Sequence, residues 1–200
     1  MKKLILLSIG LLLSGALEAQ IEKGDVQLGM ALRFSRQDFV SNDINLNSYH
    51  PSAALFISKR TSVGLMLGYR STMTSTIANS NRNETIRLSD RVYQLGFYSR
   101  YHVPINKKLY LYLQPSLLLG VGKSNQSPTI SANLKTVNAY VAPGVSYFLG
   151  KQWAVDLSFS GLRYTRISDE LAGVKQTNQR TDFNANFNNM DIGISFYIRQ

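Results

Sequence analysis

Apolar and polar residues alternate with a period of two along eight stretches of this chain. The last stretch shows the pattern best, because Met190, Ile192 and Ile194 fall on one side of an extended chain and Asp191 and Gly193 on the other. Such alternation is typical of a β-strand with two unlike faces, and eight strands in succession favour a closed antiparallel barrel. We therefore predict an all-β, up-and-down barrel with strands near residues 26–35, 49–58, 63–70, 93–103, 109–121, 137–148, 153–160 and 190–199.

The two rows of side chains differ in size as well as in polarity. One row is mainly Leu, Val, Ile and Phe, whereas the other is rich in Gly, Ala, Ser, Tyr, Gln and charged residues. The lumen of an eight-stranded barrel is only just wide enough to be filled by side chains, so we assign the small and polar row to the lumen and the apolar row to lipid. The barrel is then a transmembrane one. Aromatic girdles are expected at its rims, from Tyr49, Tyr69 and Tyr93 at one end and Tyr101, Tyr147, Trp153 and Phe196 at the other.

The connections between the stretches alternate between short and long. Outer-membrane barrels have short periplasmic turns and longer external loops, so this alternation predicts eight strands with both ends of the barrel on the periplasmic side. No low-complexity linker divides residues 20–200, which suit one domain. The short connections lie near residues 59–61, 104–108 and 149–152, and the long ones, expected to be surface loops, near residues 36–48, 71–90, 123–136 and 163–186.

The first 19 residues have the layout of a secretory signal peptide. Lys2 and Lys3 precede an apolar run, which leads through small residues to Ala19. Cleavage there, or after Ala16, would remove two lysines and at most one glutamate; cleavage after Ala19 lowers the formal net charge from +10 to +9. The chain contains no cysteine, so closure of the sheet must supply the stability that disulfides could have added. We expect export to the outer membrane.

Several short motifs resemble those of a known family. They are Arg100-Tyr101, Gln114-Pro115-Ser116-Leu117, Pro143 to Phe148 and Gly193 to Ile198. With them, the chain resembles the small outer-membrane β-barrel proteins of the OmpA/OmpX type, particularly the variety common in Bacteroidota. The resemblance implies an outer-membrane barrel whose last strand is recognised by the barrel-assembly machinery during insertion.

Charged residues on the lumen face must be paired if they are buried. We predict carboxylate–guanidinium contacts across the lumen, including one between Arg100 and Asp156. The alternative is a proton or ion path, which the narrow lumen disfavours. The ionisable residues that the alternation directs inward are Arg33, Arg70, Arg100, His102, Asp156 and Asp191.

One motif suggests an enzyme. His50-Pro51-Ser52 is loosely similar to the His-x-Ser of outer-membrane lipid A deacylases, which need an acidic residue to orient the imidazole. The Asn that follows the Ser in that family is replaced by Ala53, no Glu lies at the matching distance, and the pair faces the lumen in our register. We therefore predict no catalytic residue, and keep the deacylase as an alternative beside a soluble barrel that binds a small apolar ligand.

The sequence offers little else from which to build a cofactor or metal site. It contains two His residues, no Cys and no phosphate-binding glycine loop, so we expect neither cofactor nor metal, and no nucleic acid partner. We expect a monomer in a structural or surface-interaction role, with a packed, non-porous lumen. Its basic loops would attract the phosphates of outer-membrane lipid and lipopolysaccharide, and an extracellular partner could bind them. The loop residues are Arg82, Arg87, Arg91, Arg163, Arg166, Lys175 and Arg180.

Overall fold

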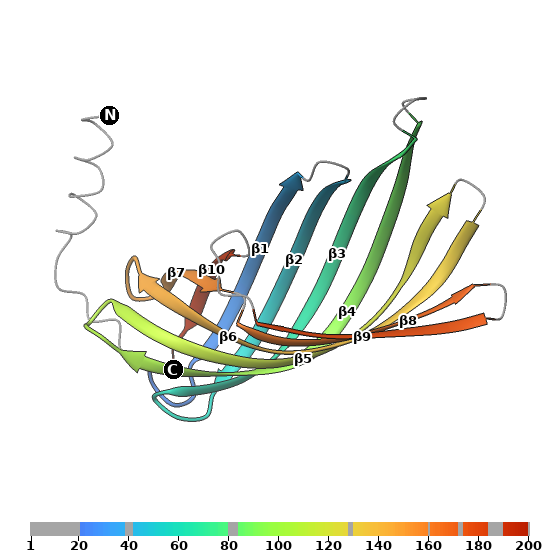
Figure 1. The fold of residues 1–200 in the computed structure, drawn as a ribbon. Helices are drawn as coiled ribbons and strands as arrows, with labels where there is room; N and C mark the ends of the chain where they lie inside the picture. Colours follow the sequence, from blue (N-terminus) through green and yellow to red (C-terminus); the bar gives the residue numbers. More distant parts are fainter. Residues whose placement is uncertain are drawn as a thin grey trace, which may run out of the picture.

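The chain forms ten strands in the part that the computed structural model describes, which is residues 21–38, 42–79, 84–127, 130–159, 161–171, 174–183 and 190–199 (Figure 1). The expected signal peptide lies outside these ranges and stays a prediction. No helix in these ranges is long and apolar enough to cross a membrane. The strands are β1 (Val26–Asp38), β2 (Asn42–Phe56), β3 (Thr61–Asn79), β4 (Glu84–Pro104), β5 (Leu109–Ser127), β6 (Ile130–Phe148), β7 (Trp153–Phe159), β8 (Leu162–Leu171), β9 (Val174–Phe183) and β10 (Met190–Ile198).

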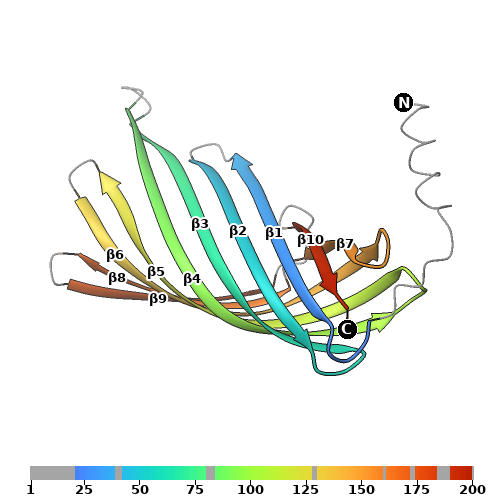
Figure 2. The ribbon, with the colours of Figure 1, turned by 180° about the vertical axis from the view of Figure 1, so that it is seen from behind.

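Eight of these strands close a ring. Strands β1 to β6 each pair antiparallel with the next along the chain, β7 pairs with β10, and β10 pairs with β1 (Figures 1 and 2). The closing pair runs from Val26 opposite Ile198 to Leu32 opposite Ile192. This ring confirms the predicted eight-stranded antiparallel barrel.

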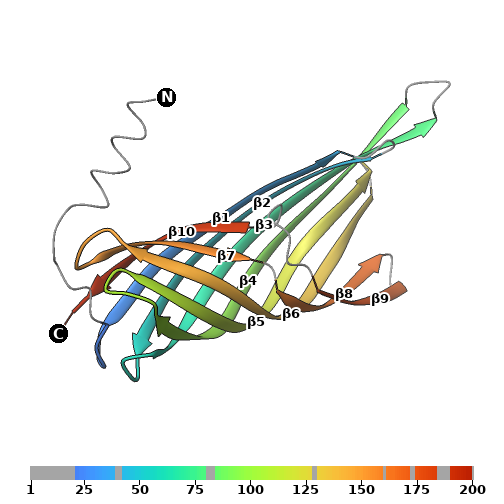
Figure 3. The same ribbon diagram turned by 60° about the vertical axis from the view of Figure 1, so that its left-hand side comes forward.

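Strands β8 and β9 form a hairpin that extends the barrel at one end. β8 pairs with β6 from Val141 opposite Leu162 onward, along the same edge of β6 that pairs with β7 nearer the short turns. Among the described strands, β9 pairs with β8 alone, and β1 beyond Leu32 pairs with β2 alone. The hairpin therefore diverges from β1 while it stays beside β6 (Figure 3).

The four long connections are strand over most of their length, which corrects the expectation of long loops. The β3–β4 ladder, for example, runs from Thr61 opposite Tyr101 to Asn79 opposite Glu84. These segments are rich in Ser, Thr and Asn on both faces. The alternation of apolar and polar residues therefore stops where the strands leave the apolar belt, although backbone pairing continues. Without that alternation, the sequence of a strand resembles that of a loop.

The apolar row faces outward, as predicted. Phe97 and Val121 are 66% and 62% exposed, whereas Tyr98 and Leu118, of the other row, are 5% and 2% exposed. A soluble barrel would show the reverse arrangement.

Aromatic rings mark both ends of the outward apolar belt. Tyr49, Tyr69 and Tyr93 are directly opposite one another on β2, β3 and β4, and their ring centroids are 6.2 and 5.2 Å apart. At the end with the short turns, the ring centroids of Trp153 and Phe196 are 4.8 Å apart. Such girdles are typical of membrane interfaces.

Candidate functional site

The lumen is closed at the short-turn end by a floor of aromatic side chains. Phe56, His102, Tyr110, Phe148 and Tyr197 are each at most 7% exposed. Their rings form a continuous set of contacts, with centroids 5.3 Å apart for Phe56 and His102, 5.4 Å for Tyr110 and Phe148, and 4.8 Å for Phe148 and Tyr197. Inward side chains from β2, β4, β5, β6 and β10 thus meet on the barrel axis and fill it.

An ion pair lies directly above this floor. Arg100 donates from Nη1 to Asp156 Oδ2 at 3.1 Å, which confirms the predicted pair. It also donates from Nε and Nη2 to Gln114 Oε1, at 2.9 and 2.7 Å, and its guanidinium lies 4.1 Å from the ring centre of Tyr112. Three groups from β5 and β7 therefore stabilise one buried cation.

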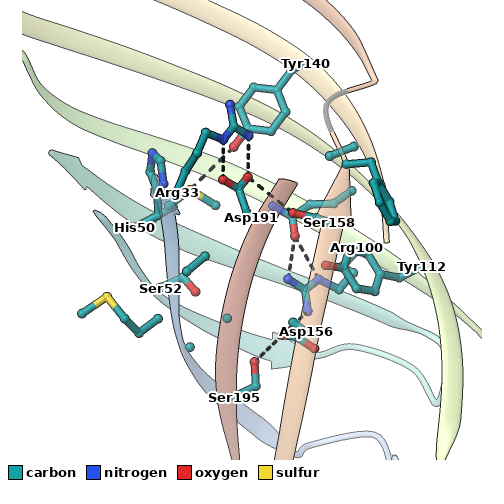
Figure 4. Close-up of a pocket in the computed structure, with 18 of the residues that line it drawn as sticks. Arg33, His50, Ser52, Arg100, Tyr112, Tyr140, Asp156, Ser158, Asp191 and Ser195 are labelled. Atoms are coloured by element: carbon teal, nitrogen blue, oxygen red, sulfur yellow. Dashed lines mark hydrogen bonds and ion pairs between the residues drawn. The ribbon is translucent and has the colours of Figure 1, made fainter. Parts of the chain in front are cut away.

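Asp156 extends this network to three further strands. Ser146 donates to its Oδ1 at 2.5 Å, and Ser195 donates to its Oδ2 at 2.6 Å. Gln27 donates to Ser195 Oγ at 2.8 Å. Side chains from β1, β4, β5, β6, β7 and β10 are thereby joined across the lumen, part of which is shown in Figure 4.

A second ion pair lies nearer the hairpin end. Arg33 donates to both carboxylate oxygens of Asp191, at 2.5 and 2.6 Å, and Ser158 donates to the same carboxylate at 3.4 Å (Figure 4). Asp191 therefore joins β1, β7 and β10. All six ionisable residues that the alternation directs inward lie on the lumen side or in its wall, as expected: Arg33, Arg70, Arg100, His102, Asp156 and Asp191.

Small cavities lie along the described part of the lumen, between the two ion pairs and around the second one. One cavity of about 40 Å³ reaches from Arg100 to Arg33, and one of about 50 Å³ is lined by Arg70, Asn138 and Arg163. A buried water needs roughly 10–15 Å³ of such space, so each cavity has room for a few waters at most. An apolar layer occupies much of the lumen at this depth, formed by Ala54, Met66, Tyr98 and Leu118 with Tyr140 packed against them.

The His50 and Ser52 pair lies on the lumen side, as predicted. Both line the cavity of about 40 Å³, and the acidic residues in the same lining are Asp156 and Asp191 (Figure 4). Asp191 binds Arg33 and Ser158, and Asp156 binds Arg100, so both carboxylates are engaged by groups other than the imidazole. Within the part of the chain that the structure describes, neither carboxylate is hydrogen-bonded to the His50 imidazole.

Some of the basic residues expected in surface loops face outward from strands, and one faces the lumen. Arg91 and Arg166 are exposed, and their strand positions face outward. Arg163 faces the lumen instead, where its guanidinium lies 5.6 Å from the ring centre of Tyr140. Arg82 lies outside the described residues, as do the side chains of Arg87, Lys175 and Arg180.

Sequence reasoning missed most of the lumen network. It assigned the small and polar row to the lumen but gave no role to four of its members, Gln27, Gln114, Ser146 and Ser195. The signals that could have indicated a role were their inward position and a nearby charge. It also missed that the inward aromatic residues form a floor.

A protein-family model and several solved structures are similar to this chain. The model of a family described as outer membrane protein beta-barrel domain matches residues 4–197. No curated protein sequence matches. Among solved structures, the chain is similar to Neisserial surface protein A (TM-score 0.47, 17% identity, 86% of this chain and 95% of that one). It is also similar to the translocator domain of the autotransporter NalP from Neisseria meningitidis (TM-score 0.46, 9% identity, 98% of this chain and 93% of that one). A third similar structure is the outer membrane protease OmpT from Escherichia coli (TM-score 0.41, 8% identity, 92% of this chain and 96% of that one).

Proposed function

The chain belongs to the outer membrane protein beta-barrel domain family, and we propose that it is a non-enzymatic barrel with a closed lumen that acts in a structural or surface-interaction role. It conducts no solute through its interior. Its working surfaces are the outward face in the membrane and the extended hairpins beyond the outer girdle, among them the β8–β9 hairpin that diverges from β1 (Figure 3). In this role it is a monomer, inserted by the barrel-assembly machinery.

The observation that carries the proposal is the filled lumen. An aromatic floor, the network around Arg100 and Asp156, and the apolar layer around Leu118 follow one another along the axis. A solute would have to displace buried ring contacts and also break hydrogen bonds to two buried charges. Removing one partner of such a charge pair costs about 3–5 kcal/mol, which makes spontaneous opening rare.

The absence of catalysis is supported by the interior chemistry. The carboxylates nearest His50 in its cavity bind arginines and serines, and His50 and Ser52 face the lumen rather than the lipid acyl chains that a deacylase would cleave. The soluble alternative is incompatible with the outward apolar row, since Phe97 and Leu67 are 66% and 56% exposed.

Planar-bilayer recording of the purified protein tests the closed lumen. Insertion is first verified by heat-modifiable migration on a denaturing gel. We expect no stepwise conductance from the inserted wild-type protein. Stable single-channel steps from the wild type would overturn the closed lumen, and steps that appear only in a Phe148→Ala, Tyr197→Ala variant would support the floor as the barrier.

Incubation of the inserted barrel with acylated glycolipid tests the absence of enzymatic activity. We expect mass spectrometry to show no released fatty acid. Release that is abolished by Ser52→Ala would overturn the proposal and restore the deacylase alternative.

Sequencing the N-terminus of the protein from outer-membrane fractions would test the expected cleavage after Ala19.

A further inference from the structure

Four basic residues form a continuous line on the outward face of β4, β5, β6 and β8. Arg91 is directly opposite Lys123, Lys123 is diagonal to Lys135, and Lys135 is diagonal to Arg166. Directly opposite side chains begin about 4.5–5.5 Å apart and diagonal ones about 7–8 Å apart. All four residues are exposed. We call this line the basic ladder.

The basic ladder brings four positive charges together on one outward face. Of the outward side chains that the structure describes on these four strands, none is a carboxylate. Like charges directly opposite each other, as in Arg91 and Lys123, destabilise a sheet. An anion from outside the chain would remove this repulsion.

The depth of the ladder indicates which anions it meets. Tyr93 of the outer girdle lies two residues from Arg91 on the same face of β4, toward the apolar belt. The ladder is therefore just beyond the aromatic girdle, at the level of lipid headgroups. Basic residues at that level attract anionic headgroups by about 1 kcal/mol each.

An apolar groove lies on the same outward face, deeper in the membrane. It has a volume of about 950 Å³, and outward residues of β3, β4, β5, β6, β8 and β9 line it. Leu65, Phe97 and Leu117 form its wall, and Tyr164 on β8 lies two residues, about 7 Å, from Arg166 of the ladder. Leu162, Tyr164 and Thr181 of the groove lining come from the β8–β9 hairpin, which diverges from β1 (Figure 3).

We propose that the ladder and the groove form one binding site for a phosphorylated lipid of the outer leaflet, with its phosphates on Arg91, Lys123, Lys135 and Arg166 and an acyl chain in the groove. The inference rests on the proposed function, because it requires the barrel to be inserted in the outer membrane. Charge complementarity favours this occupant. A second copy of the chain would place its own basic ladder against this one, and an uncharged lipid would leave the ladder unneutralised.

Nanodiscs of phosphatidylcholine test the site when they are doped with diphosphoryl lipid A or with its dephosphorylated form. Native mass spectrometry then counts the lipids retained by the protein. We expect the wild type to retain diphosphoryl lipid A selectively. Lys123→Gln, Lys135→Gln should weaken retention about 30-fold, since each charge contributes about fivefold. The matched control is Lys59→Gln, Lys151→Gln, in exposed turns at the opposite end, and it should behave as the wild type.

A second measurement separates lipid binding from a general effect on stability. In detergent without lipid A, the double ladder variant should be as stable as the wild type or more stable, because repulsion is removed. With diphosphoryl lipid A, only the wild type and the control should gain stability. Equal retention of the two lipid A forms by the wild type, the same loss in the control, or a dimer of the chain across this face would overturn the inference.

The same experiments distinguish failure of this site from failure of the proposed function. A barrel that inserts, shows heat-modifiable migration and does not select phosphate contradicts the site alone. A protein that remains soluble contradicts the proposed function as well. Retention of inorganic phosphate with the same affinity as lipid A would overturn the part of the inference that places an acyl chain in the groove.

Discussion

Arg100 and Asp156, 56 positions apart in the chain, form a buried ion pair of 3.1 Å across the lumen. Each of the two residues is less than a tenth exposed. Such a pair is stable only if the remaining donors and acceptors are also satisfied. Here Gln114 accepts from the guanidinium, and Ser146 and Ser195 donate to the carboxylate. Both charged groups therefore have further hydrogen-bond partners besides each other.

Removing one member of this pair should destabilise the barrel strongly. Asp156→Ala leaves the Arg100 charge buried without its carboxylate and removes the acceptor of the Ser146 and Ser195 hydroxyl groups, so we expect a loss of about 3–5 kcal/mol in the free energy of unfolding. Urea unfolding in detergent micelles, followed by fluorescence of Trp153, the single tryptophan, measures this loss. Arg100→Leu, Asp156→Leu should lose less than Asp156→Ala. If the double leucine variant lost as much free energy of unfolding as Arg100→Leu and Asp156→Leu lose together, the two residues would not be coupled.

Gly144 should tolerate no side chain. It is directly opposite Tyr112, and a Cβ at Gly144 would overlap the Tyr112 ring, on which Arg100 lies. We expect Gly144→Ala to lower the free energy of unfolding by about 1–3 kcal/mol, because the ring must move. Gly150 lies in a short turn, where an added methyl group would meet no atom within 4 Å, and it provides the control. Gly150→Ala should change stability by less than about 0.5 kcal/mol.

A charge in the outward apolar belt should have a cost that depends on depth. Leu117 lies in the apolar groove, whereas Met73 lies on β3 beyond Tyr69 of the outer girdle. We expect Leu117→Arg to destabilise the barrel folded in lipid by about 2–4 kcal/mol, and Met73→Arg to destabilise it by about 0–1 kcal/mol. Refolding into vesicles over a urea series compares them. Equal costs would contradict the assignment of the membrane boundary.

Thiol labelling can map the same boundary, because the chain contains no cysteine. Leu65 and Asn125 are both outward and exposed, but Leu65 lies in the groove and Asn125 near the end of β5. In intact membranes, a membrane-impermeant maleimide should label Asn125→Cys and leave Leu65→Cys unlabelled. Detergent solubilisation should make both react. Labelling of Leu65→Cys before solubilisation would contradict its contact with lipid.

The faces of the strands could be predicted because a single strand contains the required information. Phe97 and Tyr98 are neighbours in sequence and must point to opposite faces, and the bulk of the apolar row decides which face is outward. The ends of the strands could not be predicted in the same way. Beyond Tyr69 most side chains of β3 are polar on both faces, with Met73 and Ile77 as exceptions, so the extended pairing has no regular signature in hydrophobicity.

Interactions between strands were predicted only where charge selected the partners. Arg100 and Asp156 are among few inward ions, so their pairing could be anticipated, whereas many inward serines could have matched the role of Ser195. The basic ladder was missed for a related reason. Lys123 and Lys135 are ordinary polar positions within their own strands, and their proximity to Arg91 depends on the register between strands.

The pairing of β1 with β10 also constrains how this protein can fold. Val26 and Ile198 are opposite each other although they are separated by most of the chain, so the last hydrogen-bonded seam has a very high contact order. Loop-closure entropy opposes that seam until the intervening hairpins have formed. Until β10 arrives, the edges of β1 and β7 remain open and able to pair wrongly with another chain. Faithful folding therefore requires that these two edges be shielded while the chain is still incomplete.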